Sequence, residues 1–158
     1  MQKQVHEEAA HRVLRQFRQV FNAVKTHFQQ VEKKVGLGGA QVWALSVVQQ
    51  APGIGVGALA AAMEIHQSTA SNLVKTLVER GFLTVTRDPD DLRVVRLKLL
   101  ASGARALRRA PGPYAGVLPE ALAALDLATL KRIELDLAKL MKVLKVDSRS
   151  GAIPLAEL

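Results

Sequence analysis

The sequence of 158 residues contains no cysteine, few aromatic residues and no long apolar run. The lack of cysteine excludes disulfides, thiolate metal sites and catalytic thiols. No apolar stretch approaches the roughly 20 residues that a membrane-spanning helix needs. Residues 1–15 are charged throughout and lack the apolar core of a signal peptide. We therefore expect a cytoplasmic protein with no membrane partner.

Acidic residues are also scarce, because 14 Asp and Glu stand against 22 Lys and Arg, which gives a formal charge of +8. With 49% hydrophobic residues, a chain of this length can form one folded domain with a real core. The positive excess therefore lies on a folded surface and favours an anionic partner, of which nucleic acid is the first candidate. It is not concentrated in one segment: residues 1–35 hold seven bases and three acids, residues 67–100 hold six and four, and residues 101–115 hold three and none.

Two long amphipathic helices are predicted at the ends of the chain. Apolar residues recur at helical spacing within residues 4–35, and again from Leu130 to Leu144. The first stripe contains several phenylalanines. Core or dimer packing is the default interpretation of such a stripe, and the alternative is a pocket for a small-molecule effector. The candidate effector-binding residues are Phe17, Phe21, Trp43 and Tyr114.

The middle of the chain is divided into short elements. Helical spacing predicts helices at about residues 40–50, 57–63 and 68–80, the last two separated by a four-residue turn. The period then changes to two on either side of the turn at residues 88–91, which predicts a β-hairpin. This order matches a helix-turn-helix followed by a wing. We predict a mainly α-helical winged helix-turn-helix with a two-stranded β wing.

The 68–80 helix and the hairpin have the residue types that DNA reading requires. Small polar side chains at the start of a helix let it approach base edges in the major groove. Arginine on a thin ribbon can enter the narrow minor groove. We expect the carboxylate of Asp91 to hold the guanidinium of Arg93. The predicted DNA-binding residues are Ser68, Thr69, Ser71, Asn72 and Lys75 on the helix, and Arg87, Asp91, Arg93 and Arg96 on the hairpin.

Residues 57–63, residues 67–83 and the stretch Arg87-Asp-Pro-Asp-Asp-Leu-Arg93 resemble the multiple-antibiotic-resistance regulator (MarR) family of bacterial transcription factors, and Leu97, Leu99 and Gly103 continue the pattern. The resemblance implies a homodimer that binds double-stranded DNA at pseudo-palindromic operators. Such dimers usually repress transcription, and a small aromatic effector often releases them from DNA. It also implies the organisation of the chain: residues 1–146 form one protomer, with dimerisation helices at 1–35 and 101–146 and a DNA-binding lobe at 40–100. Residues 147–158 have lost the helical periodicity, which predicts a loosely held tail.

The chain departs from the family pattern in three places. Asn72 stands where many relatives carry a basic residue, although asparagine suits adenine in the major groove. Leu100 replaces the threonine that usually caps the helix after the wing, which leaves Ser102 as the candidate cap. Pro111-Gly-Pro113 interrupts what is commonly one long connecting helix.

Other functions have weaker support in the sequence. A helical adaptor that binds protein through its winged domain remains the main alternative. Gly53–Ala58 matches a dinucleotide-binding fingerprint in letters, but it follows a predicted helix and not a strand. His6 and His11 are five residues apart, so their side chains point about 140° apart on a helix and cannot form the H-E-x-x-H zinc site. We therefore expect no enzymatic activity, no cofactor and no metal.

Overall fold

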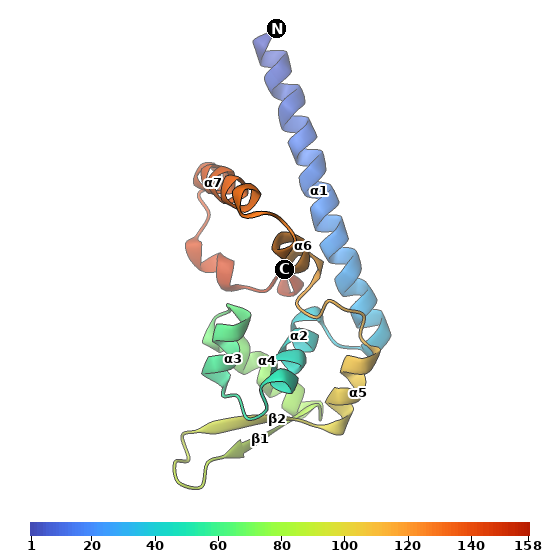
Figure 1. Cartoon of the computed structure of the whole chain (residues 1–158), viewed down its shortest axis with the longest axis vertical. Helices are drawn as coiled ribbons and strands as arrows, with labels where there is room; N and C mark the ends of the chain where they lie inside the picture. Colours follow the sequence, from blue (N-terminus) through green and yellow to red (C-terminus); the bar gives the residue numbers. More distant parts are fainter.

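The computed structural model describes residues 1–158 and is mainly helical, with one two-stranded antiparallel sheet. A compact lobe lies at one end, α1 projects from it as a long rod, and α7 stands beside that rod (Figure 1). The winged helix-turn-helix prediction is confirmed. The elements are α1 (Gln2–Val35), α2 (Gly39–Gln50), α3 (Val56–Met63), α4 (Gln67–Glu79), β1 (Leu83–Arg87), β2 (Val95–Leu99), α5 (Ala101–Arg109), α6 (Val117–Ala123), α7 (Leu127–Leu144), and the 3-10 helices η1 (Ser148–Ala152) and η2 (Leu155–Glu157).

The core of the lobe is formed by α2, α3, α4, α5 and the hairpin. Four apolar side chains of α4 are buried, as their helical spacing predicts: Ala70, Leu73, Val74 and Leu77. Val78 follows Val74 by four residues, a spacing that predicts an inward-facing side chain, but it is 37% exposed. At 100° per residue it lies roughly a quarter turn away from the buried stripe, so it falls on the flank of the helix.

The base of the wing is fixed to the lobe by backbone hydrogen bonds. Leu83 pairs with Leu99 and Val85 with Leu97 across the hairpin. On the outer side of β2, the Gly53 N–H donates to the Leu97 carbonyl and the Leu97 N–H donates to the Ile54 carbonyl, each at 2.9 Å. Residues 53–54 are therefore a loop paired with the wing, and no parallel strand precedes them.

The start of α5 differs from the prediction. Leu100 is the residue before the helix and has the extended conformation of an N-cap, but no side chain caps the helix. Ser102 does not substitute for the missing threonine, because it already lies inside the first turn. Its hydroxyl instead donates a hydrogen bond to the Gly81 carbonyl, which joins α5 to the turn between α4 and β1.

The connection after α5 is broken at the predicted place. The helix ends at Arg109, and a bent segment containing a cis Gly112–Pro113 bond leads to α6. The imidazole of His27 on α1 is buried, and its Nε2 lies 3.1 Å from the Pro113 carbonyl oxygen. This contact ties the bent segment to α1.

The two outer helices leave most of their surface uncovered. In α1 only Val24, His27 and Val31 are buried, all in the C-terminal third, and α7 buries no residue. Large apolar side chains therefore face solvent on both helices, among them Phe21 and Leu135. No helix combines the length and apolarity needed to span a bilayer.

Residues 147–158 differ from the predicted loose tail. They form η1 and η2, and η2 lies against α2 and α1. The two helices are too short to leave a periodic pattern in the sequence, which is why the prediction missed them.

Candidate nucleic-acid interface

The exposed face of α4 is polar and lies opposite the stripe that packs into the lobe. His66 precedes the helix in an extended conformation, and no side chain caps the N–H groups of the first turn. Thr69 is half-buried and turned to one side of this face. The other four predicted side chains are exposed, and we call them the reading face: Ser68, Ser71, Asn72 and Lys75.

One arginine of the wing is held by an ion pair that the sequence analysis did not predict. The guanidinium of Arg96 donates to the carboxylate of Asp88 at 2.9 Å. This hydrogen bond, with another from the backbone N–H of Asp90, lowers the pKa of Asp88 below its usual value. The pair joins β2 to the turn that follows β1, so Arg96 supports the shape of the wing.

Asp91 has a different partner from the one predicted. Its Oδ1 accepts a hydrogen bond from the backbone N–H of Arg93 at 3.0 Å, not from the guanidinium. This bond from a side chain to the backbone two residues later is that of an Asx turn. Asp91 therefore stabilises the turn and does not hold the arginine side chain. The guanidinium of Arg93 makes no hydrogen bond within the chain, whereas that of Arg87 donates to the Leu92 carbonyl at 3.2 Å.

The reading face and the wing are joined by a short, well-fixed turn. After α4, Gly81 adopts a φ of 76°, which favours glycine, and the Phe82 N–H donates to the Leu77 carbonyl at 2.9 Å. The hairpin then extends from the lobe at the end away from α1 (Figure 1). The structure thus presents a polar helix and a ribbon with a free arginine on one rigid lobe.

The four candidate effector residues do not form one pocket. Phe17 and Phe21 stack on each other at 6.1 Å and line an apolar hollow between α1 and α7. Trp43 packs against the core of the lobe, and the Tyr114 hydroxyl donates to the Leu107 carbonyl at 2.9 Å. Phe21 lies ten residues before Val31, or about 15 Å along the helix, so it is beyond the reach of the lobe.

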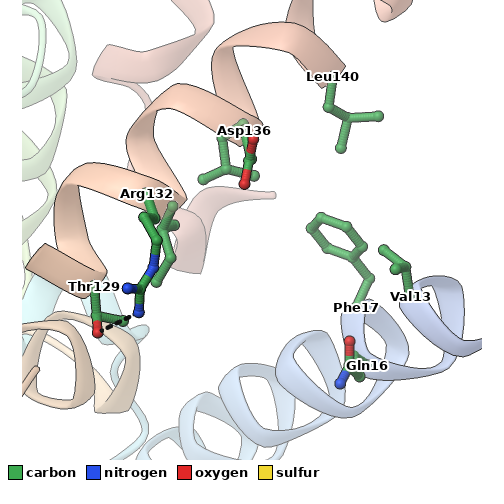
Figure 2. A pocket seen from close by; sticks show the side chains of 9 residues that line it. Val13, Gln16, Phe17, Thr129, Arg132, Asp136 and Leu140 are labelled. Atoms are coloured by element: carbon green, nitrogen blue, oxygen red, sulfur yellow. Dashed lines mark hydrogen bonds between the residues drawn. The ribbon is translucent and has the colours of Figure 1, made fainter.

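A second hollow of about 540 Å³ lies between α1 and α7. Figure 2 shows side chains of the two helices facing one another across it, with Val13 and Phe17 on α1 and Leu140 on α7. Arg132 donates to the Thr129 hydroxyl at 3.0 Å along one wall. The hollow is a gap between two uncovered helices and has no built polar site.

Comparison with known protein families finds a match in the lobe. A family model described as MarR family matches residues 35–93, which include the reading face and most of the wing. No curated protein sequence matches the chain. The match to the family model confirms the resemblance that the sequence motifs indicated.

Solved structures share the fold of nearly the whole chain. A MepR-like protein complexed with pseudoligands is 17% identical with a TM-score of 0.59, and the match covers 84% of this chain and 94% of that one. The PcaV regulator from Streptomyces coelicolor in complex with its natural ligand is 24% identical with a TM-score of 0.53, over 85% and 92%. A mutant of MarR from E. coli complexed with operator DNA is 17% identical with a TM-score of 0.54, over 82% and 96%. At these identities the likeness is one of fold. The similar proteins are transcription regulators and not enzymes.

Proposed function

Because residues 35–93 match the MarR-family model and the chain has the fold of MarR-family transcription regulators, we propose that this protein is a sequence-specific regulator that binds double-stranded DNA. It acts as a homodimer that represses transcription. Each protomer contributes one reading face and one wing, and the two half-sites lie about one helical turn of DNA apart.

The observation that carries this proposal is the pairing of the reading face with the free guanidinium of Arg93 on one lobe. A helix fits the major groove, where Asn72 can pair with an adenine and Lys75 with a phosphate or guanine. On a duplex bound by the reading face, Arg93 of the wing would contact a minor groove, whose narrow, negative floor attracts a guanidinium. Neither feature contributes to the core, so their conjunction supports a binding role.

The uncovered helices support the homodimer. The N-terminal two-thirds of α1 and all of α7 leave apolar side chains in solvent, including Val13, Leu14, Phe21 and Leu144. Contiguous exposed apolar surface of this kind marks an interaction site in a folded protein. A second copy of the chain would cover both faces by two-fold symmetry and would set the distance between the two reading faces.

Release from DNA by a small aromatic ligand is the finer part of the proposal. The apolar hollow beside Phe17 and Phe21 is the candidate site, and a dimer would enclose it further. A thermal-shift screen of aromatic acids tests this, because a ligand that binds only the folded state raises the unfolding temperature. A ligand that raises that temperature and also weakens operator binding would be the effector, whereas no shift at millimolar ligand would argue against this site.

The decisive experiment is selection of bound duplexes from random DNA, followed by fluorescence anisotropy on the selected sequence. We expect a pseudo-palindromic motif and binding that weakens steeply with salt, at a log-log slope of about −0.9 for each phosphate contacted. Loss of reporter transcription when the motif overlaps a promoter would identify a repressor. Equal affinity for every duplex would contradict sequence-specific regulation.

A further inference from the structure

Residues 147–158 form a segment that returns from α7 to the lobe, and we call it the C-terminal strap. Lys145, with a φ of 52°, ends α7 and turns the chain. Asp147 then accepts hydrogen bonds from the Arg149 backbone and from its guanidinium, the latter at 3.0 Å. These local bonds give the strap a defined path and neutralise its only basic side chain.

The first anchor of the strap is the residue that precedes the reading helix. The His66 backbone N–H donates to the Ala152 carbonyl at 3.3 Å, and its Nε2 lies 3.0 Å from the Arg149 carbonyl oxygen. His66 is the N-cap residue of α4. The strap is thus attached at the end of the helix that would enter the groove first.

The second anchor is the core of the lobe. Pro154 is buried, and Ala156 packs against the core cluster near the start of α2. A Cβ added at Gly39 would lie 3.0 Å from the Ala156 methyl group, which shows how closely the two backbones approach. The strap therefore crosses from the helix-turn-helix turn to α2 and is held at both ends.

Between its anchors the strap faces one flank of α4. A hollow of about 400 Å³ lies between the strap and α4, with Gln41 of α2 on its wall. Ile153 and Glu157 line it from the strap, and Thr69, Asn72 and Thr76 line it from α4. Asn72 also belongs to the reading face, so the surface that would contact bases borders directly on the strap.

This arrangement conflicts with insertion of α4 into DNA. The major groove is about 12 Å wide, and a helix with its side chains has a diameter of about 10–12 Å. A second chain segment at the N-terminal end and along one flank leaves the helix no room to seat fully. The carboxylate of Glu157 would in addition approach the phosphates and be repelled by them.

We propose that the C-terminal strap is an autoinhibitory cover, which has to leave His66 and the flank of α4 before the reading face can engage DNA. This inference rests on the proposed function and adds a regulatory step to it. The strap links α7 to α4, so a change at the dimer helices can alter the fraction of protein that is ready to bind. The apparent Kd is the intrinsic Kd divided by that fraction.

A reversible lock on the full-length chain tests the closed state. The sequence has no cysteine, so the double variant Gln41→Cys/Glu157→Cys carries the only two thiols, and both line the same hollow. A short bismaleimide should join them and weaken operator binding at least tenfold relative to the same variant without reagent. The single variant Gln41→Cys treated with the same reagent is the matched control and should keep its affinity.

A second variant opens the strap. Ala156→Asp places a carboxylate against the core, where an unpaired charge is costly, so the strap should leave its site. If the strap is docked about nine-tenths of the time, operator affinity should rise about tenfold. Leu158→Ser, at a side chain that is 85% exposed, should leave the affinity unchanged. Circular dichroism of both variants checks that α1 to α7 remain folded.

The outcomes separate this inference from the proposed function. Weaker binding when locked together with tighter binding when opened supports the cover. Equal affinity in locked, open and native protein overturns it while leaving DNA binding intact, and weaker binding on opening overturns it by making the strap a DNA contact. Failure of all forms to bind any selected duplex contradicts the proposed function itself.

Discussion

The backbone N–H of Arg93 donates to the carboxylate of Asp91 at 3.0 Å, and this bond leaves the arginine side chain without an internal partner. The Val94 N–H also donates to the Asp91 carbonyl, at 2.9 Å, so the aspartate organises the turn from both its side chain and its backbone. The wing tip is therefore shaped without using the guanidinium. The free charge is available for a phosphate or a minor groove.

Arg93→Ala should weaken operator binding by about 1.5–3 kcal/mol, the range for a hydrogen bond to a charged group, while the free energy of unfolding stays unchanged. Anisotropy titrations at fixed salt measure the first quantity and urea denaturation the second. Asp91→Ala should weaken binding less, because it loosens the turn without removing the charge. Native affinity in Arg93→Ala would exclude the wing from DNA recognition.

Substitutions of Asn72 and of Lys75 should affect DNA binding in different ways. If Asn72 pairs with one base through both the oxygen and the nitrogen of its side-chain amide, Asn72→Ala should cost about 1–3 kcal/mol on the native operator and relax the preference at one base pair. Lys75→Ala should weaken all sequences alike and reduce the salt slope by about one phosphate contact. Titrations against a panel of single-base-pair operator variants distinguish the two patterns. A uniform loss in Asn72→Ala would reassign that residue to the backbone.

The helices of the lobe were predictable because their burial is periodic. The apolar residues of α4 at positions 70, 73, 74 and 77 produce a pattern that only a helix fits, and they leave the opposite face polar. In α2 the same reasoning is less complete. Helical spacing does not single out Val42 and Leu45, which are both buried, since neighbours cover this helix on several sides and no single stripe describes it.

The fine geometry of the site could not be predicted. A carboxylate two residues before an arginine can accept a hydrogen bond from the arginine's backbone or from its side chain. The sequence also does not decide between Asp88 and Asp91 as the partner of a given guanidinium. The strap was missed for a related reason. Its first anchor joins His66 to residues more than 80 positions away, and no local pattern records such a contact.

Gly103 should tolerate no side chain. A Cβ there would lie 2.6 Å from the Phe82 carbonyl oxygen and 2.6 Å from Leu99 Cδ1, so Gly103→Ala should destabilise the protein by about 1–3 kcal/mol in urea denaturation. Gly57→Ala is the matched control in another short helix, where the nearest atom is 4.0 Å away. It should stabilise by about 0.4–1 kcal/mol, since alanine restricts the unfolded chain more. Equal effects at the two sites would contradict the packing at Gly103.

Asp126 should make the stability of α7 depend on pH. It caps the helix by accepting hydrogen bonds from the Thr129 hydroxyl at 2.7 Å and from its backbone N–H at 2.9 Å, which lower the pKa of Asp126. A lowered pKa means that the folded state binds the proton less readily than the unfolded state. The stabilisation is therefore complete above the usual aspartate pKa and is lost as pH falls through the lowered value.

The comparison with Asp126→Asn measures this contribution, because asparagine can cap but does not titrate in this range. The native protein should be the more stable at neutral pH, and the difference in unfolding temperature should shrink below the usual aspartate pKa. A difference that stays constant down to acidic pH would show that the cap does not depend on charge.

Phe21 should be needed for dimerisation and not for folding of the protomer. Its side chain is 59% exposed and stacks only on Phe17, so a polar replacement costs the single chain little. In a two-fold dimer both subunits carry the replacement. Loss of two phenylalanines from an apolar interface reduces the free energy of association by roughly 3–6 kcal/mol. The dimer Kd of Phe21→Asp should therefore rise at least a hundredfold. Asn22→Asp adds the same charge one position along α1, on a polar side chain, and should leave the dimer intact. Sedimentation velocity at micromolar protein measures both, and operator affinity should fall with the dimer, because a single reading face gains nothing from the second half-site. A native sedimentation coefficient for Phe21→Asp would mean that this face of α1 does not hold the two copies together.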